Sequence, residues 1–133
     1  MVDQNRFSQV SLIVVDDNDT TRAMLRSILR SEGIEVVAEA RDGTTGLALV
    51  RKLRPQLVCL DVMMPDMSGI EVLTQLKLEF PDVRVIMVTG STDRDTVQAA
   101  IQGGASGYLV KPFNAAKVVA ALELALGRKP AQN

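Results

Sequence analysis

The chain has 133 residues, a net charge of −1 at pH 7 and no histidine, and this length suits one domain. The lack of histidine excludes histidine bases, nucleophiles and metal ligands within the chain, so any metal must be held by oxygen, which favours Mg²⁺. The lone Cys59 excludes an internal disulfide, and its apolar neighbours predict a buried structural thiol. No basic stripe, membrane-length apolar run or signal-peptide core is present, so we expect a cytoplasmic protein that binds neither nucleic acid nor membrane through this domain.

Five short apolar runs predict β-strands. The first, third and fourth are almost continuously apolar, which is typical of strands covered on both faces. The runs are Leu12–Val15, Ile34–Ala38, Leu57–Leu60, Val83–Val88 and Gly107–Val110.

The segments between these runs have helical patterns. In the first, apolar side chains at Met24, Leu25, Ile28 and Leu29 share one face, with Asp19 predicted as its N-cap.

Later helices carry similar start and stop signals. Ser68 and Glu71 have the spacing of a capping box, Asn114 is predicted to cap the last helix, and that helix is expected to run to about Leu126. We expect a flexible N-terminus at residues 1–9 and a polar C-terminal tail at 128–133.

Strict alternation of five strands with five helices predicts an α/β fold with a parallel sheet, helices on both faces and right-handed crossovers. In such folds, sites form beyond the carboxyl ends of the strands, where the strand order reverses. Polar residues follow four of the five predicted strands: Asp16, Asp17 and Asp19 after the first, Asp61 after the third, Thr89, Gly90 and Ser91 after the fourth, and Lys111 and Pro112 after the fifth.

This collection of side chains is suited to phosphoryl transfer. Each residue alone is more typical of a turn, a cap or a solvated surface. Two carboxylates about 4 Å apart repel by roughly 4 kcal/mol at an effective dielectric of 20, so Asp16, Asp17 and Asp61 together need a cation or a raised pKa. Carboxylates, Mg²⁺, a lysine and a hydroxyl can position a phosphoryl group and neutralise its charge.

Four segments resemble the signatures of response-regulator receiver domains, and the pattern is most similar to chemotaxis-type single-domain receivers. The resemblance covers about residues 10–127, which would form the receiver domain, and implies a flavodoxin-like (β/α)5 fold, a doubly wound five-stranded parallel sheet with strand order 2-1-3-4-5. The segments are Val14-Val15-Asp16-Asp17, Leu60-Asp61-Val62-Met63-Met64-Pro65, Val88-Thr89-Gly90 and Tyr108-Leu109-Val110-Lys111-Pro112-Phe113.

The resemblance implies a role for each matching residue. Asp61 would be the phosphoacceptor and a metal ligand, with Asp17 binding Mg²⁺ directly, Asp16 mainly through water, and Met63 through its backbone carbonyl. Thr89, Gly90 and Lys111 would bind the phosphoryl group, Thr89 and Tyr108 would form the switch, and a cis bond before Pro112 would aim Lys111 inward. Met63 and Ser91 would influence the lifetime of the phosphoryl group.

The implied function is that of a response regulator in two-component signal transduction. A histidine kinase or histidine phosphotransfer protein would donate the phosphoryl group, and the domain would catalyse only its own phosphorylation and dephosphorylation. A downstream target would bind the face formed by the fourth helix, fifth strand and fifth helix, with Asp95, Gln98, Gln102, Tyr108 and Lys117.

Three other functions are less consistent with the sequence. An aspartyl phosphatase would need a second acid two residues after Asp61, where Met63 stands. A flavin-binding module would need stacking side chains, and the chain has three phenylalanines, one tyrosine and no tryptophan. A degenerate receiver used as a scaffold would lack some of the polar residues. Whether the chain is free-standing or part of a longer protein stays open, because Arg128-Lys129-Pro130 could begin a linker.

Overall fold

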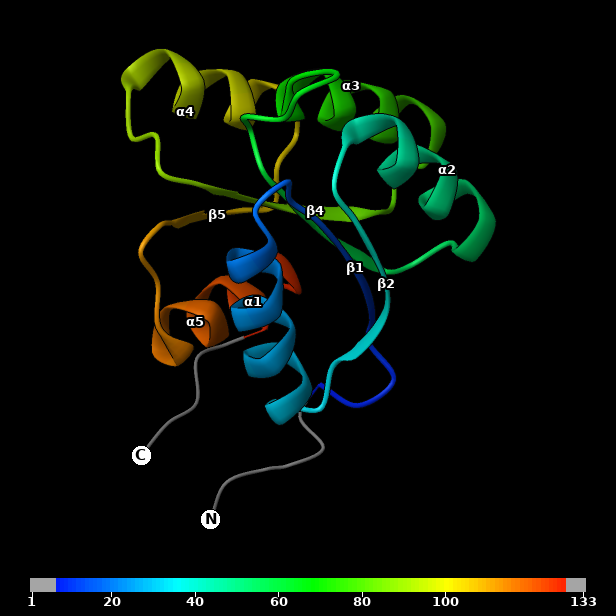
Figure 1. Cartoon of the computed structure of the whole chain (residues 1–133), viewed down its shortest axis with the longest axis vertical. Helices are drawn as coiled ribbons and strands as arrows, with labels where there is room; N and C mark the ends of the chain where they lie inside the picture. Colours follow the sequence, from blue (N-terminus) through cyan, green and yellow to red (C-terminus); the bar gives the residue numbers. More distant parts are fainter. Residues whose placement is uncertain (1–6, 129–133) are drawn as a thin grey trace.

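The computed structural model describes residues 7–128. Five parallel strands form one sheet in the order β2-β1-β3-β4-β5, which confirms the expected topology (Figure 1). Strands and helices alternate along the chain: β1 (Ser11–Val15), α1 (Asp19–Ser31), β2 (Glu35–Ala40), α2 (Gly43–Leu53), β3 (Leu57–Leu60), α3 (Gly69–Glu79), β4 (Arg84–Thr89), α4 (Arg94–Gln102), β5 (Gly107–Val110) and α5 (Ala115–Ala125).

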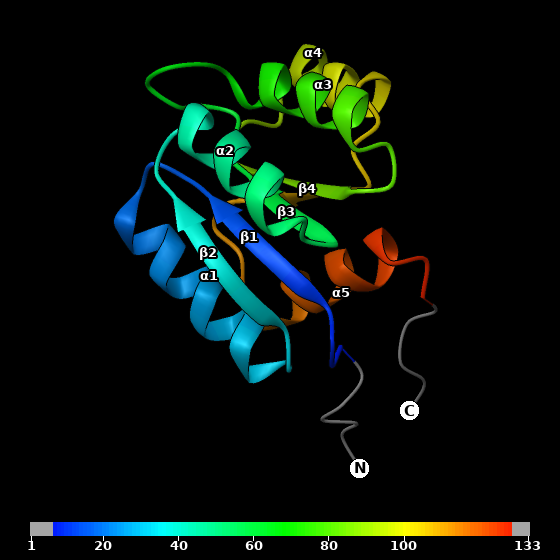
Figure 2. The same ribbon diagram turned by 90° about the vertical axis from the view of Figure 1, so that its right-hand side faces the viewer.

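The sheet separates two apolar clusters. Helices α1 and α5 cover one face, and α2, α3 and α4 cover the other (Figures 1 and 2). Successive residues of β1 point to opposite faces, so Leu12 and Val14 join one cluster while Ile13 and Val15 join the other. All four residues of β3 are buried, as expected of a central strand. Among them, Cys59 is the predicted buried thiol, and burial raises its pKa to about 12.

Two details of α1 differ from the prediction. Its N-cap is Asn18, whose side chain accepts the N–H of Thr21 at 2.8 Å, and Asp19 is already the first helical residue. Met24 is 45% exposed, whereas Leu25 and Leu29 are fully buried. The stripe that faces the sheet is centred on Leu25 and Leu29, and Met24 lies at its edge.

The other predicted caps are confirmed. Ser68 and Glu71 form a reciprocal capping box at the start of α3, and Asn114 accepts the N–H of Lys117 at 2.9 Å at the start of α5. These caps satisfy N–H groups that the first helical turn leaves free.

Helix α4 is the least buried of the helices that cover its face. Only Ala100 of its nine residues is buried, whereas α2 and α3 each bury four.

Two strands extend beyond their predicted ends. The pairing of β2 with β1 continues to Ala40, whose carbonyl accepts the N–H of Asp16 at 3.0 Å. Thr89 is the last residue of β4, not the first residue after it, because it pairs with Val110 of β5. The pairing thus fixes the backbone of a predicted site residue.

The predicted terminal segments fall largely outside the described residues, which exclude 1–6 and 129–133. Phe7 begins a turn that precedes β1, and its ring is 1% exposed. Between residues 7 and 128, no helix has the length and apolar character needed to cross a membrane.

Candidate functional site

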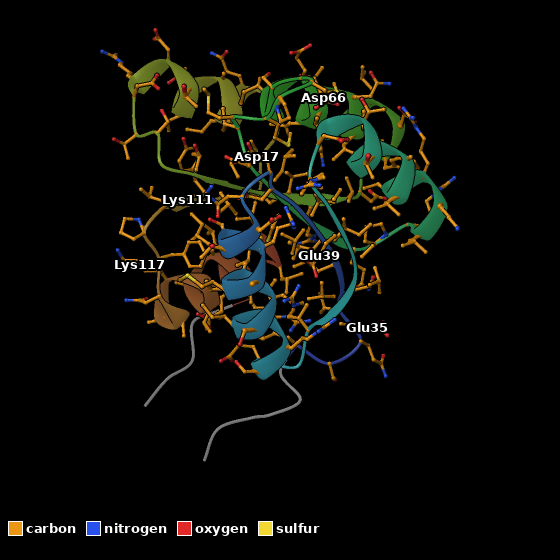
Figure 3. All side chains as sticks on the ribbon, viewed as in Figure 1. Asp17, Glu35, Glu39, Asp66, Lys111 and Lys117 are labelled. Atoms are coloured by element: carbon orange, nitrogen blue, oxygen red, sulfur yellow. The ribbon has the colours of Figure 1, made fainter. Side chains whose placement is uncertain are left out.

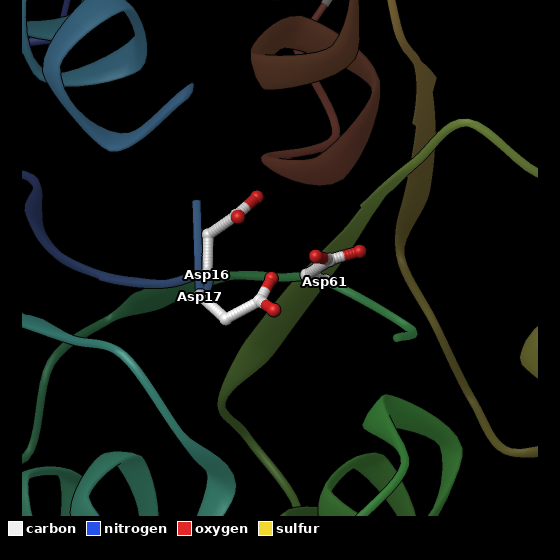
Figure 4. A group of neighbouring side chains, drawn as sticks. All are labelled: Asp16, Asp17 and Asp61. Carbon is white, nitrogen blue, oxygen red and sulfur yellow. The ribbon is translucent and has the colours of Figure 1, made fainter. Parts of the chain in front are cut away.

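Two central strands bring three carboxylates together. Asp16 and Asp61 directly follow β1 and β3, and the N–H of Asp61 donates to the carbonyl of Val15 at 2.9 Å. Carboxylate oxygens of Asp16, Asp17 and Asp61 lie within 4.8 Å of one another (Figure 4). Asp16 and Asp61 are 1% and 4% exposed, whereas Asp17 is exposed to solvent. The sheet therefore holds a compact acidic cluster with one open side.

The cluster perturbs the titration of Asp61. Burial and then the nearby Asp16 carboxylate raise the pKa of its carboxyl group from 3.8 to about 6, a net shift that Lys111 opposes. The N–H of Met63 donates to Asp61 Oδ1 at 3.4 Å. A cation that enters the cluster would stabilise the ionised form of Asp61.

Lys111 supplies a positive charge from the end of β5. Its Nζ lies 3.0 Å from Asp16 Oδ2 and 3.4 Å from Asp61 Oδ2. The Lys111–Pro112 peptide bond is cis, as the resemblance implied, and the N–H of Lys111 donates to the carbonyl of Thr89 at 2.9 Å. Figure 3 shows Lys111 and Asp17 at the same edge of the sheet.

The residues of the cluster fit a hard cation. Asp16 Oδ1 accepts the N–H of Asn18 at 2.8 Å, whereas the buried Oδ2 has the ion-pair contact with Lys111 but no hydrogen bond with any described residue. Three carboxylates, one of them with a buried oxygen that makes no hydrogen bond to described residues, form a donor set of oxygen atoms, which Mg²⁺ prefers. Met63 follows Asp61 by two residues, and its side chain is 72% exposed, so only its backbone lies beside the cluster.

The predicted switch residues form a second group. Thr89 is 1% exposed, and its Oγ1 accepts the N–H of Ser91 at 3.2 Å. The hydroxyl of Tyr108 donates to the carbonyl of Ser91 at 2.8 Å. Burial and then the Asp93 carboxylate raise the pKa of Tyr108. Both side chains therefore contact the loop between β4 and α4, and no hydrogen bond between described residues joins either to the carboxylates. Gly90 lies in this loop and is exposed.

Sequence reasoning missed two side chains that bind the backbone of neighbouring segments. Arg22 of α1 donates to the backbone carbonyl of Asp16 at 2.7 Å and lies 3.5 Å from Glu39 at the end of β2. Asp66 binds the start of α2 across 23 residues of sequence. Arginine at the start of a helix and aspartate in a loop are too common to indicate such contacts, and only the folded chain shows them.

Comparison with known families agrees with this geometry. A model of the response regulator receiver domain matches residues 12–123. The chain belongs to this family.

Relatives of this receiver domain include free-standing and multidomain proteins. It is 38% identical over 116 residues to the chemotaxis protein CheY of Listeria monocytogenes, covering 87% of the chain and 98% of CheY. It is 40% identical over 117 residues to the DNA-binding response regulator MtrA of Mycobacterium tuberculosis, covering 88% of the chain but only 50% of MtrA. A solved CheX–CheY–BeF3–Mg²⁺ complex from Borrelia burgdorferi matches with a TM-score of 0.87 and 27% identity, covering 96% of each chain.

The family places this receiver domain in two-component signalling. Its structure brings together Asp16, Asp17, Asp61 and Lys111, four of the predicted site residues. Thr89 and Tyr108 lie on the adjoining strands and are linked through Ser91.

Proposed function

We propose that the domain accepts a phosphoryl group on Asp61 from a phosphohistidine and thereby changes a partner-binding face. The observation that carries this proposal is the environment of Asp61: a carboxylate that is 4% exposed, grouped with Asp16 and Asp17, with Lys111 Nζ 3.4 Å from its Oδ2. This arrangement combines a nucleophile with charges that would stabilise a transferred phosphoryl group.

Asp16, Asp17, Asp61 and the backbone carbonyl of Met63 would hold Mg²⁺. When bound, the ion would supply positive charge that offsets both the acidic cluster and the phosphoryl oxygens.

In the transfer step, an Asp61 carboxylate oxygen attacks phosphorus. An O–P bond forms, the P–N bond to the donor imidazole breaks, and the imidazole keeps the electron pair and takes a proton from water. Lys111, which contacts two carboxylates in the free protein, would pair with a phosphoryl oxygen, and the Thr89 hydroxyl and Gly90 backbone would bind others. Hydrolysis would return Asp61 to its free state, so the domain would act on its own phosphoryl group and not on a separate substrate.

The change would be reported through Thr89 and Tyr108. Thr89 Oγ1 and the Tyr108 hydroxyl both bind Ser91, so movement of Thr89 toward a phosphoryl group would alter the loop that leads into α4. The target would bind the face formed by α4, β5 and α5. A shallow groove lined by Tyr108, Lys117 and Leu124 lies on this face, where Leu124 is 70% exposed.

The donor would be a histidine kinase or a histidine phosphotransfer protein, because the chain contains no histidine. The sequence has a net charge of −1 and no basic stripe that would favour nucleic acid, so we propose protein partners only. We also propose that residues 10–127 form the receiver domain. The domain would work in the cytoplasm.

The test is phosphorylation by acetyl phosphate or a phosphohistidine donor, followed by intact mass. We expect one added phosphoryl group on the wild-type chain with Mg²⁺, none with EDTA, and none on Asp61→Asn. Asp82→Asn, which removes an exposed carboxylate far from the cluster, is the matched control and should react normally. Normal labelling of Asp61→Asn would refute the assignment, and repeated turnover of a generic phosphate ester would instead favour a phosphatase.

A further inference from the structure

Asp66 joins the loop between β3 and α3 to the start of α2. Its Oδ1 accepts the N–H of Gly43 at 2.9 Å and that of Met67 at 2.9 Å. Its Oδ2 accepts the N–H of Thr44 at 2.8 Å and the hydroxyl of Thr44 at 2.6 Å. These hydrogen bonds lower the pKa of Asp66 well below its usual value. The carboxylate therefore binds two separate segments at once.

Helix α2 uses this carboxylate as part of its cap. Four N–H groups at the start of a helix have no partner within the helix. The side chain of Asp42, the N-cap, accepts one of them, the N–H of Thr45, at 2.7 Å, while its carbonyl accepts the first bond of the helix, from the N–H of Gly46 at 3.1 Å. Asp66 accepts two more, from Gly43 and Thr44. The first turn of α2 is satisfied only with the loop in place.

The loop makes few other hydrogen bonds to its surroundings, although Met64 and Met67 pack against the apolar cluster on this face of the sheet. At its ends, Asp61 is bound to β1, and the N–H of Gly69 donates to the carbonyl of Val62 at 2.8 Å. Between them, among the residues that the structure describes, every hydrogen bond from residues 64–67 to another element passes through Asp66. Apart from the hydrogen bond from the Met63 N–H to Asp61 Oδ1 at 3.4 Å, Asp66 is therefore the described side chain whose hydrogen bonds hold the middle of the loop against another element.

Close packing supports the same contact. A Cβ atom on Gly43 would lie 2.4 Å from Met67 Cγ and 2.9 Å from Met67 Sδ. Met67 thus lies directly against the backbone of α2, and the absence of a side chain at position 43 permits this approach. Figure 3 shows Asp66 at the top of the molecule, beside the start of α2.

We propose that Asp66 is a positioning residue that holds the β3–α3 loop so that the Met63 carbonyl faces the acidic cluster. This inference rests on the proposed function, in which that carbonyl binds Mg²⁺. Loss of Asp66 would leave the carboxylates in place but allow the carbonyl to move, which would weaken metal binding without removing a ligand side chain.

The matched control is Asp42. Asp42→Ala removes a carboxylate and a cap from the same helix end but breaks no contact with the loop.

Mg²⁺ binding is measured by calorimetry for the wild type, Asp66→Ala, Asp66→Asn and Asp42→Ala, at low and high KCl, because salt screens a simple charge effect. Amide hydrogen exchange of residues 62–67 is measured without metal. Asp66→Asn keeps the shape of the side chain and serves if Asp66→Ala does not fold.

We expect both Asp66 variants to weaken Mg²⁺ binding roughly 10-fold, the lower end of the loss seen when residues behind a metal ligand are removed. The loss should persist at high salt, and exchange in the loop should quicken, while Asp42→Ala binds Mg²⁺ like the wild type. An unchanged Kd in both Asp66 variants, or an equal loss in Asp42→Ala, would overturn the inference. A wild-type chain that binds no Mg²⁺ would overturn the metal dependence in the proposed function itself.

Discussion

The acidic cluster makes the charge on Asp61 costly, so Asp61→Asn should stabilise the metal-free protein. The pKa of this carboxyl group is raised from 3.8 to about 6. At 1.36 kcal/mol for each pKa unit, this shift corresponds to about 3 kcal/mol. Water that reaches the cluster beside the exposed Asp17 screens part of this cost, which leaves about 1–2 kcal/mol.

The sign of the pH dependence follows from linkage. Between pH 3.8 and about 6, the folded state keeps a proton on Asp61 that the unfolded state has lost, so wild-type stability falls as pH rises. Above about pH 6 the full cost is present, and below 3.8 both states are protonated and it disappears. The advantage of Asp61→Asn should therefore be absent near pH 3.5 and reach its full value by about pH 7.

Urea unfolding in EDTA, repeated across this pH range, measures the difference between the two proteins. Asp82→Asn, an exposed site, is the control for the loss of one charge and should show no such pH-dependent gain. Adding Mg²⁺ at ten times its Kd should restore about 1.4 kcal/mol to the wild type and much less to Asp61→Asn. Equal stability of the two proteins at pH 7 without metal, or a difference that does not change with pH, would refute the reasoning.

Three further outcomes are expected. Lys111→Met removes the cation that opposes the shift at Asp61, so the pKa of Asp61 should rise further in an NMR titration; a fall would contradict this. Cys59, whose pKa is raised to about 12, should resist a thiol reagent at pH 8 in the folded protein and react after unfolding. Ser68→Ala should lower the free energy of unfolding by about 1 kcal/mol, because it removes an N-cap whose hydroxyl accepts the Glu71 N–H; unchanged denaturant midpoints would count against this role.

The sequence was sufficient to predict the strands and the acidic cluster. Alternation of apolar runs with helical patterns determines a parallel sheet, and a residue that follows a central strand must lie at its carboxyl edge. The sequence alone therefore groups Asp16, Asp61 and Lys111 at one edge of the sheet. The structure confirms their proximity, while their roles in phosphoryl transfer stay predictions.

Other features depend on contacts that no local pattern encodes. Asn18 and Asp19 are adjacent, and both residue types favour the N-cap position, so the sequence does not distinguish between them. Asp66 and Arg22 bind backbone groups of other segments, Gly43 and Asp16. Such contacts arise only when the elements pack, so a search for spacing along the chain does not find them.

Because α4 is only slightly buried, a small change in free energy is sufficient to displace it. Withdrawing Ala100, its only buried residue, together with partly covered neighbours, costs about 1–2 kcal/mol. A single hydrogen bond such as that from Tyr108 to Ser91 contributes about 1 kcal/mol, which is of the same order. In the proposed switch, making or breaking this bond would therefore be sufficient to shift α4, whereas displacing α3, with four buried residues, would require several such bonds to change together.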